Sequence, residues 1–156
     1  GDFNGDGKSD ILWRQKSTGA LVLWLMDGAV VKSRARDIGG SAGGRDWGIQ
    51  GIGDFDGDRQ AAILLRRKST GALSVWLMNG GLVRAYPYIS GFDAAGVASD
   101  QVVQQVADFN SDGRADILWR GTSDGVASIW LMDGATVKSV VTGVAVPVDS
   151  VVEPQP

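Results

Sequence analysis

The chain repeats one unit three times, and this internal repeat constrains its fold more than any other feature of the sequence. The stretch Lys-Ser-Thr-Gly-Ala-Leu at residues 16–21 returns unchanged at residues 68–73, 52 positions later. Asp-Ile-Leu-Trp-Arg at residues 10–14 returns at residues 116–120, 106 positions later. The three units therefore begin at equivalent aspartates, namely Asp2, Asp54 and Asp108.

Each unit contains short β-branched and aromatic runs separated by turn signals. Residues 11–13 and 21–26 are such runs in the first unit, and Ser17-Thr18-Gly19 between them suits a turn. Asp-Gly or Asn-Gly then stands where a type I′ hairpin turn requires positive φ. A third run follows this turn, and a fourth run precedes the later aspartate loops, at residues 47–52 and 101–106. Four antiparallel strands form one β-propeller blade, so the sequence predicts an all-β fold of three four-stranded antiparallel blades.

We expect residues 1–156 to form a single repeat domain with units of approximately 1–45, 46–99 and 100–147. The first unit is expected to lack its leading strand. Residues 148–156 contain Asp-Ser-Val-Val-Glu, which is similar to the leading strand that begins at Asp100, and are expected to complete the first blade. Three blades are too few to close a ring, since propellers contain about four to eight. The chain is therefore expected to be a homo-oligomer or part of a longer propeller.

The aspartate loops of the first and third units have the composition of calcium sites. Side-chain oxygens recur at loop positions 1, 3, 5 and 9, glycine stands at position 6, and position 7 would contribute only its main-chain carbonyl. Several hard oxygen donors on a sharply turned loop are what calcium requires. The alternative is an aspartate-rich turn held by its own hydrogen bonds. The candidate ligands are Asp2, Asn4, Asp6, Lys8 and Asp10 in the first loop, and Asp108, Asn110, Asp112, Arg114 and Asp116 in the third.

The second loop departs from this pattern. It keeps Asp54, Asp56 and Asp58, but Arg59 replaces the turn glycine and Ala62 replaces the ninth-position aspartate. A missing carboxylate and a non-glycine residue at a position that favours positive φ weaken a calcium loop. We expect an empty or low-affinity site here, with a salt bridge from Arg59 as an alternative way to neutralise the aspartates.

The phrases Asp-Phe-Asn-Gly-Asp-Gly-Lys-Ser-Asp-Ile-Leu-Trp and Trp-Leu-Met-Asp-Gly resemble FG-GAP or VCBS-type repeats. These repeats are related to the calcium-loop blades of integrin α-subunit propellers. The resemblance implies a β-propeller with Ca²⁺ in its loops, recognition or scaffolding more than catalysis, and an extracellular or cell-surface location. The second loop departs from the family pattern, which puts a third calcium ion in doubt.

The first functional hypothesis is a calcium-stabilised, non-catalytic module that binds carbohydrate or protein. Trp24, Trp76 and Trp130 recur in every unit and are interpreted mainly as core. Trp47 has no tryptophan counterpart in the other units, so Trp47, together with Tyr86 and Tyr88, is the candidate for a unit-specific, lectin-like binding surface. A purely structural assembly unit is a further alternative.

The second hypothesis is glycan hydrolysis by a pair of carboxylates. The chain has no histidine or cysteine, which removes the commonest general base and thiolate metal sites. We expect no nucleic-acid binding, because the net charge is −3, and no membrane insertion, because no apolar run is long enough. The chain is therefore not expected to be an enzyme. The carboxylates outside the loops that a hydrolase would have to use are Asp27, Asp46, Asp100, Asp124 and Asp133.

Overall fold

The computed structural model describes residues 1–39, 44–91, 97, 100–147 and 149–152. Every regular element within these residues is a β-strand, so the all-β prediction is confirmed. The described residues contain no helix long and apolar enough to cross a membrane.

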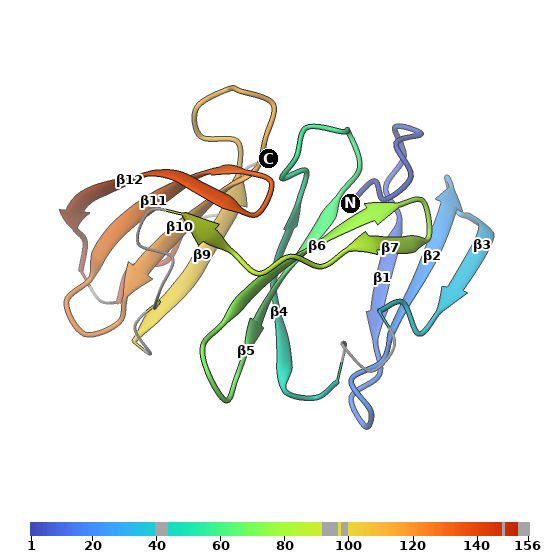
Figure 1. Ribbon diagram of the computed structural model, residues 1–156, viewed down its shortest axis with the longest axis horizontal. Helices are drawn as coiled ribbons and strands as arrows, with labels where there is room; N and C mark the ends of the chain where they lie inside the picture. Colours follow the sequence, from blue (N-terminus) through green and yellow to red (C-terminus); the bar gives the residue numbers. More distant parts are fainter. Residues whose placement is uncertain (40–43, 92–96, 98–99, 148, 153–156) are drawn as a thin grey trace.

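The strands form three separate sheets, one for each sequence repeat (Figure 1). The first sheet has the order β1 (Ile11–Arg14), β2 (Leu21–Asp27), β3 (Val30–Arg36). The second has the order β4 (Trp47–Gly53), β5 (Ala62–Arg67), β6 (Leu73–Asn79), β7 (Leu82–Ala85). The third has the order β8 (Ser90–Gly91), β12 (Thr136–Ala145), β11 (Val126–Asp133), β10 (Asp116–Gly121), β9 (Gln101–Ala107).

The pairing confirms the predicted strands, including the leading strands β4 and β9. All neighbours are antiparallel except β8, which follows β7 and pairs in parallel with β12 of the next sheet. This connection between consecutive sheets was not predicted, because a two-residue strand has no detectable period in the sequence. The pairings β2–β3, β6–β7 and β11–β12 each have a register shift at the same Leu-Met step of the repeat. The shifts lie at Leu25/Met26, Leu77/Met78 and Leu131/Met132.

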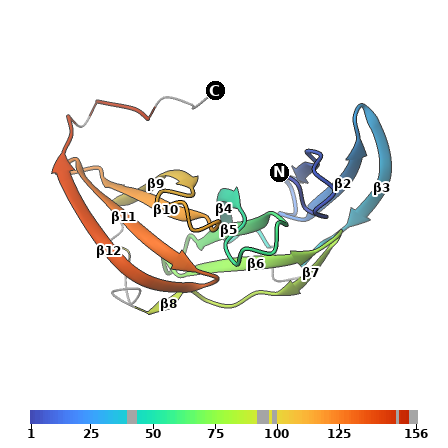
Figure 2. The same cartoon turned by 90° about the horizontal axis from the view of Figure 1, so that it is seen from above.

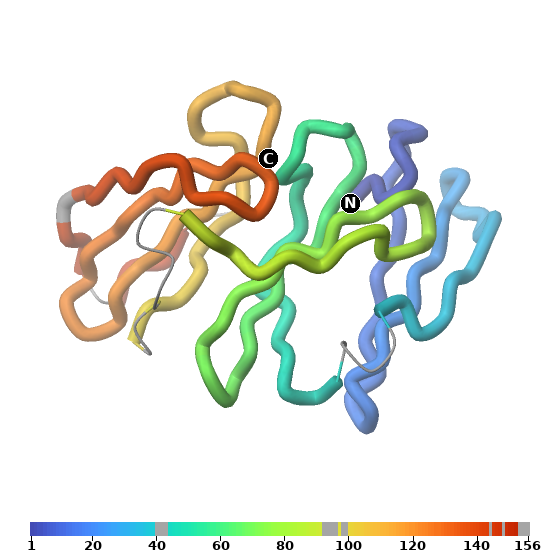
Figure 3. The backbone as a smooth tube through the Cα atoms, viewed as in Figure 1, coloured from blue at the N-terminus to red at the C-terminus, as the bar shows by residue number. Residues whose placement is uncertain are grey.

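The three sheets lie in an open arc. Seen from above, β3, β7 and β12 run along the outside of the arc, whereas β4, β9 and the N-terminus lie on its inner side (Figure 2). The continuous tube shows how the chain completes one sheet before it crosses to the next (Figure 3). Consecutive repeats are therefore neighbours in space, and the two ends of the arc are formed by the first and the third sheets.

Successive side chains along a strand point to opposite faces of the sheet, and in these sheets both faces carry apolar side chains. We call the face that packs on the following unit the forward face, and the face that packs on the preceding unit the reverse face. In the second sheet, Leu64 and Leu73 belong to the forward face and share a buried core with the third sheet. Ile63, Leu65 and Trp76 belong to the reverse face and share a core with the first sheet. The middle sheet is thus buried on both sides.

The first sheet has three strands and lacks a leading strand, as expected. Of the tail that was expected to supply that strand, residue 148 and residues 153–156 lie outside the described residues. Residues 149–152 form no strand within the single chain and lie beside the third sheet, where the Arg120 guanidinium donates to the carbonyls of Pro147 and Ser150. Completion of the first sheet by this tail within one chain is therefore not what the described residues show, and completion by a second copy stays a prediction.

Candidate metal centres

The three aspartate loops lie side by side along one edge of the molecule (Figure 1). Each loop is joined to the next by a main-chain hydrogen bond. The N–H of Ala61 donates to the carbonyl of Asp2 at 2.6 Å, and the N–H of Ala115 donates to the carbonyl of Asp54 at 2.6 Å. The loops therefore connect neighbouring sheets as well as strands within a sheet.

The first loop turns back on itself, and its side-chain oxygens accept hydrogen bonds from main-chain N–H groups of the same loop. The Asp2 carboxylate accepts hydrogen bonds from the N–H groups of Gly5 and Gly7, both at 2.7 Å. Asn4 Oδ1 accepts from the N–H of Asp6 at 3.0 Å, and Asp6 Oδ1 accepts from the N–H of Lys8, also at 3.0 Å. Gly7 has a φ of 81°, which an L side chain rarely adopts and which explains the glycine at loop position 6.

The third loop has the same geometry. The Asp108 carboxylate accepts from the N–H of Gly113 at 2.9 Å, and Asn110 Oδ1 accepts from the N–H of Asp112 at 3.0 Å. Asp112 Oδ1 accepts from the N–H of Arg114 at 2.8 Å. The internal repeat therefore extends from sequence to the position of individual oxygens.

Main-chain N–H groups stabilise the charged form of the first aspartate in both loops. For Asp108, the hydrogen bond from the Gly113 N–H is the largest effect, and it lowers the pKa of the carboxyl. For Asp2, partial burial raises the pKa, but the N–H groups of Gly7 and Gly5 outweigh it, so the net shift is downward. Both carboxylates are thus held in the anionic form that a cation requires.

The ninth-position aspartates differ from the other candidate ligands because they are buried. Asp10 accepts from the N–H groups of Phe3 and Met26, each at 2.8 Å. Asp116 accepts the equivalent pair of hydrogen bonds, from the N–H of Phe109 at 3.0 Å and from the N–H of Met132 at 2.9 Å. Burial is the largest influence on Asp116 and raises its pKa, against the two hydrogen bonds. These carboxylates tie the start of each loop to strand β2 or β11.

The basic residues at loop position 7 turn their side chains away from the loop oxygens. Lys8 Nζ lies 2.7 Å from the Asp27 carboxylate, and Arg114 Nε lies 3.4 Å from Asp133. Both hairpin aspartates also pair with a lysine of the following strand. Within the described part of the chain, the oxygens of Asp6 and its third-loop equivalent therefore have no basic partner.

The second loop carries its own cation. One oxygen from each of Asp54, Asp56 and Asp58 lies within 4.8 Å of the others. The Arg84 guanidinium of β7 enters this cluster, where Nη2 pairs with Asp56 and lies 3.2 Å from Asp58 Oδ2. The pKa of Asp56 is raised, chiefly by burial and then by the nearby Asp58 charge, and Arg84 opposes this shift.

Residues 2–65 match the family model described as FG-GAP-like repeat. This segment is therefore similar to FG-GAP-like repeats. The match covers the first unit and the second loop with β5, and the third unit repeats the sequence and loop geometry of the first. Comparisons with the curated proteins and with the solved structures found no match.

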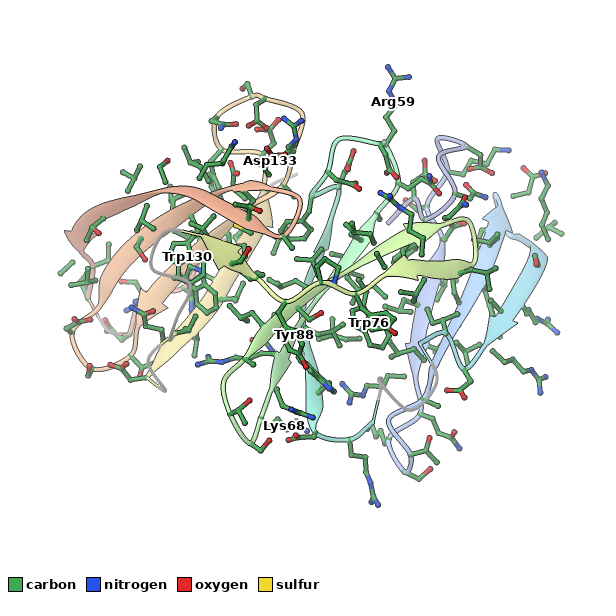
Figure 4. The ribbon with its side chains drawn as sticks, in the orientation of Figure 1. Arg59, Lys68, Trp76, Tyr88, Trp130 and Asp133 are labelled. Atoms are coloured by element: carbon green, nitrogen blue, oxygen red, sulfur yellow. The ribbon has the colours of Figure 1, made fainter. Side chains whose placement is uncertain are left out.

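Arg59 is not the residue that neutralises the second FG-GAP-like loop, which corrects one of the sequence-based alternatives. Its side chain projects away from the molecule (Figure 4), and its φ of 66° confirms the expected left-handed backbone at this position. The residue that sequence reasoning missed is Arg84. The sequence did contain an indication of this role, because both partners of one ion pair are replaced in the second unit. Gln60 and Asn79 stand where the other two units have the ion pairs Lys8–Asp27 and Arg114–Asp133.

Trp47 is not the exposed ligand platform that the sequence suggested. Only 8% of its surface is exposed, and it belongs to the core between the first and second FG-GAP-like sheets. The Arg67 guanidinium lies 5.4 Å from its ring centre and Tyr88 lies 6.1 Å away, which covers the ring further. Tyr86 and Tyr88 are exposed as predicted. A residue unique to one unit can fill a unit-specific gap in the core as readily as it can serve a ligand.

A cleft of about 440 Å³ lies at the end of the second FG-GAP-like sheet opposite the aspartate loops. Lys68 marks this end in Figure 4. The cleft is lined by basic and apolar groups together, and the Asp46 carboxylate beside it accepts a hydrogen bond from Ser69 at 2.6 Å. The residues lining it include Gln50, Arg66, Arg67, Lys68, Ser69 and Thr70.

Proposed function

We propose that this chain is a calcium-stabilised, non-catalytic β-propeller module that binds carbohydrate or protein. One observation carries the proposal. The first and third loops repeat the same oxygen-bearing residues and the same hydrogen bonds, and no ion pair among the described residues reaches Asp6 or Asp112, whereas Arg84 pairs with Asp56 and Asp58 of the second loop. An external cation fits the first and third loops, and calcium is the cation whose preferred donors they offer.

Calcium at these loops would supply charge neutralisation and rigidity. Asp2, Asn4 and Asp6, with the main-chain carbonyl of Lys8, would hold one ion, and the equivalent residues of the third loop a second. Because the Asp2 carbonyl is also the acceptor that connects the first loop to the second, an ordered first loop stabilises the contact between two sheets. The ion therefore has a structural role in this proposal.

A β-propeller is supported by the way the three sheets are arranged. They follow one another in an arc, with their leading strands on the inner side and their last strands on the outer side (Figure 2). Two apolar cores join consecutive sheets face to face. This is the arrangement of propeller blades around a central axis.

The basic cleft is the best candidate for ligand recognition. Lys68 and Thr70 present donors for the hydroxyl and carboxylate groups of an acidic carbohydrate or of a protein surface, beside Arg67 and Ser69, which Asp46 holds in place. Tyr88 is exposed nearby on the second sheet and can contribute an apolar contact. With a net charge of −3, the whole chain has no general attraction for nucleic acid.

A non-catalytic role is supported by the engagement of the remaining carboxylates. Asp27 and Asp133 are each held by two basic side chains, and Asp46 is held by Ser69 and Arg67. Asp100 accepts from the Ser123 hydroxyl and Asp124 from the Val126 N–H. These groups fix turns and strand ends in the pattern that the repeat dictates, which is the role expected of structural carboxylates.

An extracellular or cell-surface location follows from the proposed affinity. The first and third loops each bring only two carboxylates and one amide from positions 1, 3 and 5, and sites with few charged ligands bind calcium weakly. Extracellular modules work at dissociation constants of about 10⁻⁴–10⁻³ M, which match the calcium concentration outside cells.

Calorimetric titration with calcium tests the proposal. The unaltered chain is expected to bind two ions, and Asp6→Ala and Asp112→Ala are each expected to remove one. Asp58→Ala, which changes the equivalent position of the second loop, is the matched control and should leave the stoichiometry at two. Zero ions, or three equivalent ions, would contradict the proposal.

The ligand class is tested separately on a glycan array that includes acidic glycans. Binding that weakens when Lys68 and Arg67 are both changed to alanine supports carbohydrate recognition in the cleft. Turnover of a glycan that disappears with Asp27→Asn or Asp46→Asn would instead establish the hydrolase alternative.

A further inference from the structure

The cleft at the end of the second sheet has a local positive charge, although the whole chain has a net charge of −3. We propose that this cleft binds one acidic sugar unit of a glycan chain, and that Lys68 holds the carboxylate or sulfate group of that unit. The proposal rests on the proposed binding function and narrows the ligand from carbohydrate or protein to an acidic glycan. It depends neither on calcium in the loops nor on what covers the outer faces of the first and third sheets.

Basic residues dominate the charge of this cleft. Arg66, Arg67 and Lys68 line it, and none of the described residues that line it is acidic. The Asp46 carboxylate beside the cleft lies 3.1 Å from Arg67 Nε. Among the described residues, one carboxylate therefore stands against three cations. A cleft with an excess of one sign of charge attracts ligands of the opposite sign, so an acidic ligand is favoured over a neutral one.

Arg67 is held from two sides. Its guanidinium lies 5.4 Å from the centre of the Trp47 ring and pairs with Asp46. The same carboxylate accepts hydrogen bonds from the hydroxyl and the N–H of Ser69, at 2.6 and 3.0 Å. Arg67 and Ser69 are thus committed to Asp46, and they shape the cleft rather than bind its ligand.

Arg66 connects the cleft to the third sheet. Its Nη1 donates to the carbonyl of Gln101 at 2.6 Å, and its Nη2 donates to the carbonyl of Val97 at 3.3 Å. The guanidinium also lies 5.9 Å from the centre of the buried Trp119 ring. A positive charge is therefore fixed in one wall of the cleft, and this wall is formed before any ligand arrives.

Lys68 is the cation that a ligand can reach. It is exposed and lies in the turn that joins β5 to β6 (Figure 4). Its N–H donates to the carbonyl of Asp46 at 2.7 Å, which fixes its main chain. A Cβ atom at Gly48 would lie 3.9 Å from Lys68 Cε, so the lysine stem extends over β4. Within the described part of the chain its ammonium group has no partner, whereas the lysines beside the other two hairpins pair with aspartates.

The other groups that line the cleft suit a sugar ring. Gly48 and Gly71 have no side chains, and together with Val97 they leave apolar area beside the charge. Gln50 Nε2 makes a long hydrogen bond of 3.3 Å to a main-chain carbonyl. The Thr70 hydroxyl oxygen accepts a main-chain N–H at 3.3 Å, so its proton remains for a ligand. A sugar ring offers C–H groups to the apolar area and hydroxyls to the polar groups, and the volume of about 440 Å³ is that of a small-ligand site.

The main chain of the cleft favours a glycan over an acidic peptide. An extended peptide binds chiefly through main-chain hydrogen bonds to a free strand edge. Gly48 and Arg66, which line the cleft, are already paired with each other across β4 and β5. The donors that remain are side chains, which recognise hydroxyl and acidic groups rather than a peptide backbone.

The site is expected once in the chain. The equivalent residue pairs of the three units are Gln15-Lys16, Arg67-Lys68 and Gly121-Thr122. The second unit combines two basic residues, and the first has one. In the third, the Thr122 hydroxyl donates to the carbonyl of Asp100 at 2.9 Å, and Asp124 adds a negative charge to the same turn. The three units share a fold, but the charge needed for an acidic ligand is concentrated in one of them.

The test is calorimetric titration of the full chain with three probes of equal length, at one fixed calcium concentration in both solutions. The probes are an oligogalacturonate, a sulfated galactose oligosaccharide and a neutral galactose oligosaccharide. One site per chain is expected for an acidic probe, with affinity at least about tenfold higher than for the neutral probe, as the loss of a charge-assisted hydrogen bond predicts. Added salt is expected to weaken the acidic probe more than the neutral one. Binding of one acidic probe alone would identify the group that Lys68 holds.

Three variants separate Lys68 from general charge. Lys68→Ala is expected to weaken the acidic probe about tenfold and to leave the neutral probe unchanged. Lys68→Arg keeps the charge and should keep most of the binding. Lys16→Ala is the matched control, because Lys16 stands in the same Lys-Ser-Thr-Gly turn of the first unit and does not line the cleft. Both lysines are exposed, so unchanged melting temperatures are expected and show that the variants are folded.

Four results would overturn the proposal: a neutral probe that binds as tightly as the acidic ones, a Lys68→Ala chain with unchanged affinity, an equal loss in Lys16→Ala, or an oligoglutamate peptide that binds more tightly than both acidic sugars. The last result would assign the cleft to a protein partner. Failure here leaves the calcium titration unaffected, because the cleft lies at the opposite end of the sheet from the loops. A neutral glycan that binds would keep the proposed function while refuting this inference.

Discussion

The charge of the hairpin residue, which is Asp27, Asn79 or Asp133 in the three units, decides which carboxylates the basic residue of the next strand pairs with. Lys32 and Lys138 of the first and third units turn to a hairpin aspartate. The equivalent residue of the second unit is Arg84, and the hairpin aspartate there is Asn79. Because Asn79 carries no charge, the Arg84 guanidinium pairs instead with Asp56 and Asp58. An internal cation therefore stands in the second loop where calcium is proposed in the other two.

Replacement of Arg84 by alanine is expected to convert the second loop into a calcium-dependent one. In chelator, the variant should lose about 0.5–1 kcal/mol of stability, as for a partly exposed ion pair, because Asp56 and Asp58 then repel each other. In calcium, titration should reveal a third, weak ion. Lys138→Ala is the matched control and should leave the number of ions unchanged, as its lysine pairs with Asp133. Two ions in the Arg84→Ala variant would argue against this role.

The buried ninth-position aspartates are expected to act on stability even without a metal. Asp116→Ala leaves the N–H groups of Phe109 and Met132 without their acceptor, and the bond to Met132 is buried, where an unsatisfied donor costs about 1–3 kcal/mol. The variant should therefore be destabilised in denaturant unfolding both with calcium and with chelator. Asp112→Ala, whose carboxylate is exposed, should be destabilised only in calcium. Equal behaviour of the two variants would mean that Asp116 acts only through the ion.

At the scale of elements, the approach of β4 to the third sheet depends on a small residue. A Cβ atom at Gly53 would lie 2.6 Å from the Cβ of Ala115 and 2.9 Å from a methyl group of Val106. Both neighbours belong to the third unit, so Gly53 sets how closely the inner strands of two sheets can pack. Glycine at this position is a packing requirement rather than a turn signal.

Gly53→Ala is expected to lower the free energy of unfolding by about 1–3 kcal/mol, the usual effect of overpacking a core. Gly48→Ala, in the same strand, is the matched control, because its nearest neighbour is the flexible end of the Gln50 side chain at 3.3 Å. Chemical denaturation of both variants checks the prediction, and a Gly53→Ala chain as stable as the control would contradict it.

At the scale of the whole molecule, the outer faces of the first and third sheets couple stability to contact with another surface. The outer faces of the first and third sheets leave Ile11, Trp13 and Phe109 partly exposed, so these side chains gain further apolar stabilisation only where another surface covers them. A dimer that stabilises the folded state also makes the melting temperature rise with protein concentration.

Thermal melting at a series of concentrations is expected to show this rise for the unaltered chain. Phe109→Glu should melt at one temperature throughout the series, and Leu82→Glu should behave like the unaltered chain. A melting temperature independent of concentration in all three proteins would mean that the end faces contribute no stability through association.

Much of the local structure was predictable because it depends on short-range patterns. The leading strand β9, the left-handed backbone of Arg59 and the hairpin after Asp27 all follow from neighbouring residues. The predicted type I′ turn was wrong, because Asp27 pairs with Val30 at the end of the strand and only Gly28 of the Asp-Gly pair has a positive φ. The buried position of Trp47 did not follow, because a tryptophan that occurs in one unit has no repeat partner to show which face it occupies. The burial of Asp10 also escaped, since its loop position suggested only a ligand.

The sequence by itself determined that the chain is built from three equivalent units with strands and aspartate loops at set positions. This was possible because period, turn chemistry and ligand spacing are local and are repeated three times. Only the tertiary structure decided which side chains meet across units. Arg84 reaches a loop from a strand 26 residues beyond Asp58, and Phe3 is fully buried whereas the equivalent Phe109 is 38% exposed. Such contacts depend on how sheets are placed in space, which identical local sequences do not specify.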